Sequence, residues 1–152
     1  MGAIFNVFPL ILIPVLTYNI WAFSASMGNA DSAVVGAQIL AALENHESPI
    51  WDITMASGAH WILTTGDSFI LMSIILLFIE LLKSTSTGSA AIFNHALSML
   101  VFIICLVEFL LHPAFATSVF FIIMIMALLD VLAGVVVTII SARRDVEFAG
   151  QG

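Results

Sequence analysis

The amino-acid sequence predicts an all-α, polytopic membrane protein: four transmembrane helices in an antiparallel bundle, with a short interfacial helix in the outer loop. Of the 152 residues, 62% are hydrophobic and only 9% are charged, whereas an average soluble domain carries about 25% charged residues. Four stretches also reach the roughly 20 apolar residues that a spanning helix needs. Short connections join the last three stretches, which is typical of antiparallel neighbours. We therefore expect a single transmembrane domain over residues 1–152.

The four spans are predicted at about residues 4–23, 61–82, 90–111 and 115–140. Pro113, between the third and the fourth, stops a helix and forces a tight reversal of the chain. The first stretch is expected to be a retained helix rather than a cleaved signal peptide. No Lys or Arg precedes it, and its apolar run is longer than that of a usual signal peptide.

The outer loop, about residues 24–60, is the only sizeable segment outside the predicted spans. Asp31 and Ser32 can cap a short helix that runs to Glu44. The partly apolar face of this helix suits a position at the membrane interface or docked over the bundle. The aromatic residues and the glycine that follow favour an interfacial or short re-entrant approach to the second span.

The basic residues predict how the chain is oriented. Lys83, Arg143 and Arg144 are its only Lys and Arg residues. With four spans, all three fall on one side of the membrane, and the positive-inside rule makes that side cytoplasmic. Both termini are therefore expected in the cytoplasm.

Charge and motif content exclude several classes of function. A net charge of −7 has the wrong sign for holding phosphates, so no nucleic-acid partner is expected. The single cysteine, Cys105, rules out an intrachain disulfide or a CxxC knuckle, and its apolar surroundings disfavour a nucleophilic thiolate. No sequence motif assembles a nucleophile, a base and an oxyanion donor, so we do not expect an enzyme.

Ionisable residues inside a membrane are costly, and they are candidates for function by default. Asp130 is expected near mid-membrane, about 20 Å from Arg143 at about 1.5 Å per residue. Gly134 and Thr138 follow it on the same helical face, which favours a close helix–helix contact with a hydrogen bond from Asp130 to a neighbouring helix. Asp67, in the second span, is a second acid that could reach a similar depth and share a proton with Asp130. Helix packing and proton relay both remain open for this group.

Three further polar patterns mark the second and third spans. Gly66, Ser73 and Glu80 recur every seven residues and predict an inward-facing seam. Glu80 also lies one turn before Lys83, so its side chain is expected to snorkel to the inner interface. In the third span, a polar arc is expected to face protein; its members are His95, Ser98, Phe102, Cys105, Glu108 and His112.

Glu108 and His112 are four residues apart near the outer end of the third span, so we expect them to form a pair at the outer face. Haem b is the cofactor to test, because His60 and His112 both lie near the outer face and could ligate one iron. His95 lies at another level with no second histidine. The acids and histidines of the outer loop match no compact metal motif, so no metal is predicted.

A resemblance covers roughly Asp67 to Asp145. It is carried by the run FIELLKSTSTGSAAIFNHALSMLVFIICLVEFLL, followed by TSVFF, LLDVLAG and SARRD. Within these segments, the most specific positions are Glu80, Lys83, Asn94, His95, Glu108, Asp130 and the pair Arg143-Arg144. This part of the chain resembles small four-helix inner-membrane proteins of bacteria. The resemblance implies a four-helix bundle in the bacterial inner (cytoplasmic) membrane, and it implies no activity, ligand or partner.

Three functions remain open from the sequence. The first is a non-catalytic membrane subunit or scaffold that packs against copies of itself or against other membrane-protein subunits, within the lipid bilayer. The second is a small oligomeric channel or proton-coupled carrier that uses Asp130 and Asp67. The third is an electron-transfer component with a single haem.

Overall fold

The computed structural model describes residues 8–28, 31–83 and 89–149, and side chains within 8–28, 31–83 and 93–140. The chain is mostly helical. Its elements are α2 (Leu12–Ser26), α3 (Ser32–Leu43), β1 (Trp51–Thr54), β2 (His60–Leu63), α4 (Thr65–Lys83), α5 (Ser89–Leu111), the short 3-10 helix η1 (Pro113–Phe115) and α6 (Ser118–Ala149).

Three of these helices are long and apolar enough to cross a membrane: Thr65–Lys83, Phe93–Leu111 and Ser118–Ile140. They confirm the second, third and fourth predicted spans to within a few residues, and they make this chain a helical membrane protein. The first predicted span is not among them. Its helix, α2, has 15 residues, which at about 1.5 Å per residue is shorter than the roughly 30 Å hydrocarbon core. Residues 1–7 of that predicted span lie outside the described part of the chain.

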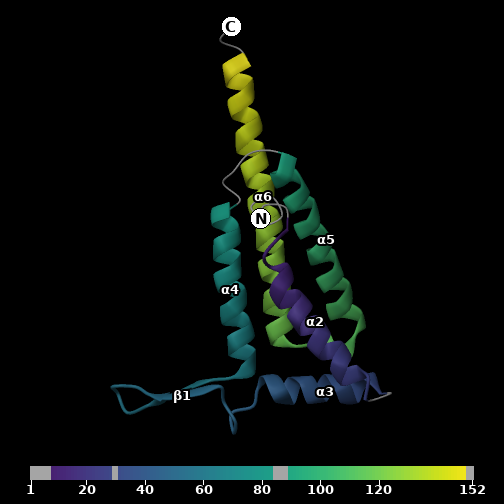
Figure 1. The fold of residues 1–152 in the computed structure, drawn as a ribbon, viewed down its shortest axis with the longest axis vertical. Helices are drawn as coiled ribbons and strands as arrows, with labels where there is room; N and C mark the ends of the chain where they lie inside the picture. Colours follow the sequence, from purple (N-terminus) through teal and green to yellow (C-terminus); the bar gives the residue numbers. More distant parts are fainter. Residues whose placement is uncertain (1–7, 29–30, 84–88, 150–152) are drawn as a thin grey trace.

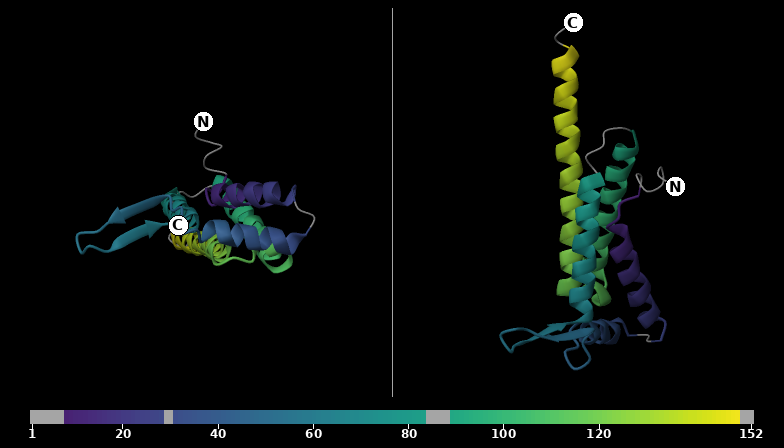
Figure 2. Two further views of the ribbon diagram at one scale, coloured as in Figure 1. Left: turned by 90° about the horizontal axis from the view of Figure 1, so that it is seen from below. Right: turned by 60° about the vertical axis from the view of Figure 1, so that its left-hand side comes forward.

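Helices α4, α5 and α6 stand side by side, with α5 running opposite to the other two (Figure 1). Helix α2 leans against them, while α3 and the hairpin of β1 and β2 lie crosswise at one end (Figure 2). We call this end, which also carries η1, the platform end. At the other end, here called the tail end, α6 projects beyond its neighbours.

Helix α3 begins at the cap that the sequence predicts and docks across η1. The side chain of Asp31 accepts a hydrogen bond from the Ala33 amide at 2.9 Å. Val35, Ile39 and Leu43 form its buried face, as expected for apolar residues at helical spacing. Gly36 lies so close to η1 that an added Cβ would come within 2.8 Å of the Pro113 carbonyl oxygen.

The hairpin of β1 and β2 corrects the all-α prediction. The two strands pair antiparallel, with Trp51 opposite Leu63 and Ile53 opposite Trp61. Gly58 closes the turn with a positive φ of 81°, a conformation that glycine adopts without strain. The alternation of polar and apolar residues in WDIT, followed by a glycine turn, is the local signal for a hairpin. Trp61 therefore belongs to β2, and the second span starts at Thr65.

An aromatic core fixes α2 to the platform end of α5 and α6. The rings of Tyr18, Phe115 and Phe120 are fully buried and lie against one another. The Tyr18 hydroxyl donates a hydrogen bond to the Ala114 carbonyl at 3.1 Å and lies 2.8 Å from the Thr117 hydroxyl. Its single polar atom is thus satisfied inside the protein, as a buried hydroxyl requires.

The contact between α3 and η1 makes a prediction about Gly36. Replacement by alanine should lower the free energy of unfolding by about 1–3 kcal/mol, because the new methyl group would clash with backbone atoms of Pro113, which cannot rotate out of the way as a side chain can. Thermal unfolding in mild detergent measures this. Gly28→Ala is the control, because a Cβ there meets nothing within 4 Å. Equal melting temperatures of the two variants would contradict the docking of α3.

Candidate functional site

A cluster of buried polar side chains lies in the half of the bundle nearer the tail end. It consists of Glu80 from α4, Asn94, His95 and Ser98 from α5, and Asp130 from α6, and we call it the polar layer. Glu80 and Ser98 are fully buried, and Asn94 and Asp130 are at most 2% exposed. Polar groups in such positions must be hydrogen-bonded to one another, because neither water nor lipid can satisfy them.

Glu80 is the centre of the polar layer and accepts three hydrogen bonds. Its donors are the Leu10 backbone amide at 2.8 Å, the Asn94 side-chain amide at 2.6 Å and the Lys83 ammonium group at 2.8 Å. Lys83 also donates to the carbonyl of Phe8 at 2.7 Å. The carboxylate therefore joins α4 to α5 and to the segment before α2.

The sequence predicts the proximity of Glu80 and Lys83 correctly but the direction of Glu80 wrongly. Its carboxylate points into the protein instead of snorkelling to the surface, and even the Lys83 side chain is only 9% exposed. The seam to which Glu80 belongs is confirmed, since Gly66, Ser73 and Glu80 are all buried. A residue that lies on this seam can reach partners on other helices before it reaches water.

Asp130 bonds across to α5, as predicted. The Ser98 hydroxyl donates to Asp130 Oδ2 at 2.5 Å, while Oδ1 has no hydrogen-bond partner among the described residues. Glu80, His95 and Lys83 lie within electrostatic range of this carboxylate. Lys83 contributes to this environment because its side chain folds inward with Glu80.

Gly134 makes room for His95, one helical turn beyond Asp130. The imidazole of His95 occupies the space that a Cβ at position 134 would need. Within the described part of the chain, neither ring nitrogen of His95 has a hydrogen-bond partner, and neither has Asn94 Oδ1. The small residue thus serves close helix contact, as the sequence predicts. Thr138 does not join the layer: it is exposed, and its hydroxyl donates to the Gly134 carbonyl of its own helix at 2.9 Å.

Asp67 does not meet Asp130. It is an exposed residue in the first turn of α4, where its Oδ2 accepts hydrogen bonds from the amide and the hydroxyl of Thr64 at 3.0 and 2.8 Å. The Asp67 amide donates back to the Thr64 hydroxyl at 3.2 Å, which completes a capping box. Counted from the platform end, the two acids are about 15 Å apart in depth at about 1.5 Å per residue. The proposed sharing of a proton between them is therefore contradicted.

Glu108 and His112 find other partners than each other. Glu108 accepts a hydrogen bond from the Asn19 side chain at 3.1 Å. Nδ1 of His112 accepts from the Ala114 amide at 3.2 Å, and its ring packs edge-on against Phe115. Glu108 and His112 remain close enough for an electrostatic interaction, but their hydrogen bonds go to α2 and η1.

The two histidines considered for haem are not brought together. His60 is the first residue of β2, in the hairpin that extends away from the bundle (Figure 1), and its Nδ1 lies 2.8 Å from Asp52 Oδ1. His112 is held at η1. Among the described residues, no three His, Cys, Asp or Glu side chains gather as metal ligands would. The side chains of Arg143 and Arg144, on which the predicted orientation rests, lie outside the described residues.

Fold and composition define the class of this chain, a membrane protein built on helices. Comparison with protein-family models, with curated proteins and with solved structures finds no match.

The contact of Gly134 with His95 yields a second prediction. Gly134→Ala should lower the free energy of unfolding by about 1–3 kcal/mol, because the methyl group and the imidazole cannot share one space. His95→Ala should remove most of that loss when the two changes are combined. A double-mutant cycle on thermal stability measures the coupling, and additive effects would show that the two residues are not in contact.

Proposed function

We propose that this chain is a non-catalytic integral membrane subunit or scaffold, which packs in a homo-oligomer or a larger complex of the bacterial inner membrane. The main support is that the hydrogen bonds of the polar layer link three helices. The Asn94 side-chain amide of α5 donates to Glu80 of α4, and the Ser98 hydroxyl of α5 donates to Asp130 of α6. The side chains so joined tie helices together, which is what a structural core does.

On α6, apolar side chains separate Asp130 from the platform end. The nearest buried polar group on that side of α6 is Thr117, about 20 Å away along the helix at about 1.5 Å per residue. Between them, the fully buried side chains on α6 are Phe120, Ile123 and Ala127. A carrier or channel needs a wet, polar path through the membrane. Such a path does not run through these residues, and this favours the scaffold.

The proposed topology has four crossings and both termini in the cytoplasm. Phe8 contacts Lys83 at the tail end of α4, and α2 then leads to the platform end. The 15 residues of α2 cover about 22 Å at about 1.5 Å per residue, and the four residues before it extend the segment to the level of Lys83. With Lys83 at the tail end, the positive-inside rule makes that end cytoplasmic.

The outside of the spans is the proposed contact surface for partner subunits. Because the polar faces of α4, α5 and α6 turn inward, their outer faces carry large apolar side chains such as Phe78, Leu100 and Leu132. In lipid these contribute no hydrophobic driving force between helices, so partners would associate by close van der Waals packing.

The oligomeric state tests this proposal. The full-length chain, extracted from its own membrane in polymer-bounded lipid discs without detergent, should give a native mass above that of one 16.4 kDa chain. The same discs dissolved in a harsh detergent supply the monomer as reference. A single chain in every disc, at the native expression level, would overturn the scaffold.

A proton-coupled carrier or channel, working as an oligomer, is the second candidate. The observation that favours it is a set of buried atoms without hydrogen-bond partners among the described residues: Asp130 Oδ1 and both ring nitrogens of His95. Such atoms call for an explanation in a native structure, and a carboxyl group that exchanges a proton is one. Asp67 takes no part in this version, because it caps α4.

Proton flux separates the two candidates. In proteoliposomes under a potassium diffusion potential, the scaffold should leave the decay of a pH gradient within twofold of protein-free vesicles. A carrier should accelerate the decay severalfold, and Asp130→Asn should abolish that acceleration without changing thermal stability by more than about 1 kcal/mol, because Asn keeps the shape and can still accept from Ser98. Ser118→Ala, an exposed change at the start of α6, is the control.

A further inference from the structure

The hairpin has two chemically different faces. Residues alternate between the faces of a strand, and the register pairs Trp51 with Leu63 and Ile53 with Trp61. One face therefore consists of Trp51, Ile53, Trp61 and Leu63, and the other of Asp52, Thr54, His60 and Ile62. On the second face, Asp52 and His60 form an ion pair at 2.8 Å. The hairpin is amphipathic.

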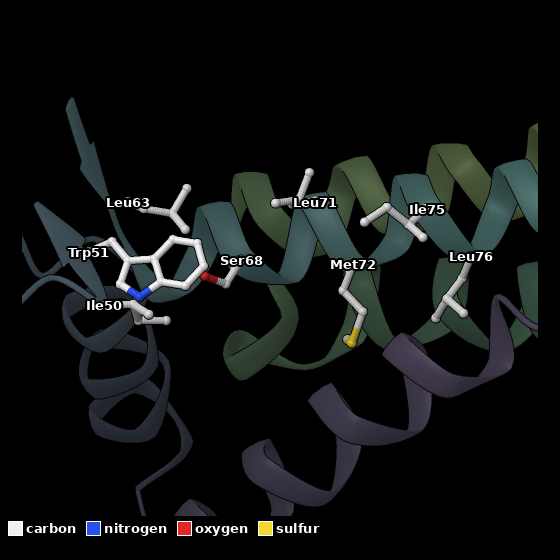
Figure 3. Close-up of a pocket in the computed structure, with 8 residues that line it drawn as sticks. All are labelled: Ile50, Trp51, Leu63, Ser68, Leu71, Met72, Ile75 and Leu76. Carbon is white, nitrogen blue, oxygen red and sulfur yellow. The ribbon is translucent and has the colours of Figure 1, made fainter. Parts of the chain in front are cut away.

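The apolar face lies on the same side as the membrane-spanning flank of α4. Trp51 and Leu63 border a groove of about 340 Å³ whose other wall is Leu71, Met72 and Ile75 of α4. Figure 3 shows these side chains in one strip along the flank of α4, with Trp51 and Leu63 at its end and the Ser68 hydroxyl beside Trp51. Since α4 is a candidate span, this strip leads from the hairpin directly into the hydrocarbon region.

The exposed aromatic side chains need a covering. Trp51 and Trp61 are 60% and 50% exposed, and Ile53 is 43% exposed. A hairpin of two strands is marginally stable by itself and needs a surface to pack on. Tryptophan is enriched where membrane meets water, because its ring is apolar and its N–H can bond to headgroups or water.

We propose that the hairpin lies in the headgroup region of the bilayer, with its apolar face toward the acyl chains, and that the groove holds an acyl chain of a zwitterionic phospholipid. Its volume, at the lower end of the range for ligand sites, suits part of one chain. Anionic lipids are disfavoured, because residues 1–82 contain no Lys or Arg. The paired Asp52 and His60 then face water.

Tryptophan fluorescence tests this placement. Trp21, the third tryptophan, is replaced by Phe, which keeps its stacking on Phe69. Trp51 or Trp61 is then the single emitter, with the other also changed to Phe. In phosphatidylcholine vesicles, a nitroxide attached near the carbonyl end of the acyl chain should quench each emitter at least twofold more than aqueous iodide does.

A matched control places an emitter on the opposite face. Thr54→Trp, in a chain whose three native tryptophans are Phe, should be quenched by iodide more than by the lipid nitroxide. The unmodified chain provides a readout that depends on no variant, since its tryptophan emission should be quenched more by the lipid nitroxide than by iodide. Adding anionic phosphatidylglycerol should leave the quenching unchanged.

Three results would overturn the proposal. Iodide quenching of Trp51 and Trp61 in vesicles that contain only this chain would place the hairpin in water, as a surface for a protein partner. Equal quenching at positions 51 and 54 would show that the faces are not distinguished. Quenching that rises with the fraction of anionic lipid would contradict the zwitterionic ligand.

Discussion

The structure depends on one constraint: a polar group in hydrocarbon must find its partner inside the protein, because lipid offers none. The Glu80 carboxylate satisfies this constraint by accepting hydrogen bonds from three parts of the chain. Its two oxygens accept from the backbone before α2, from Asn94 of α5 and from Lys83 of its own helix. A buried carboxylate without these donors would destabilise the fold by several kcal/mol. This penalty favours the one arrangement of the helices in which all three donors reach Glu80.

Because of the same constraint, different kinds of interaction hold the chain together at different depths along the bundle. In the tail half, hydrogen bonds connect the helices through the polar layer. Farther toward the platform end, the interior is mostly apolar and then aromatic. The buried Ser73 hydroxyl donates to the Phe69 carbonyl of its own helix, and the Tyr18 and Thr117 hydroxyls are hydrogen-bonded to each other. At the platform end itself, α3 and the hairpin lie crosswise, where water and headgroups can satisfy exposed backbone. Most polar groups thus lie where they can be hydrogen-bonded; among the described residues, the buried exceptions are Asn94 Oδ1, Asp130 Oδ1 and the ring nitrogens of His95.

Composition and periodicity predict four spans, of which α4, α5 and α6 are found, and they also predict the Asp31 cap, the inward seam of α4 and a hydrogen bond between Asp130 and a neighbouring helix. They fail where a side chain's partner lies far away in the sequence. Position along a helix gives the depth of Glu80, but only the packing of the segment before α2 and of α5 determines that it turns inward. Asp67 is different, because the local pattern Thr64-x-x-Asp67 signals a capping box. The hairpin, too, has a local signal, which the apolar run into α4 obscures.

A double-mutant cycle between Glu80 and Asn94 tests the central claim most directly. Glu80→Ala, Asn94→Ala and the double variant would be compared by their free energies of unfolding, measured by steric trapping in bicelles. Two residues that share a hydrogen bond of 2.6 Å inside the membrane should show a coupling of about 1 kcal/mol or more, within the range for contacting pairs. Losses that add to within about 0.3 kcal/mol would mean that the polar layer does not hold the helices together.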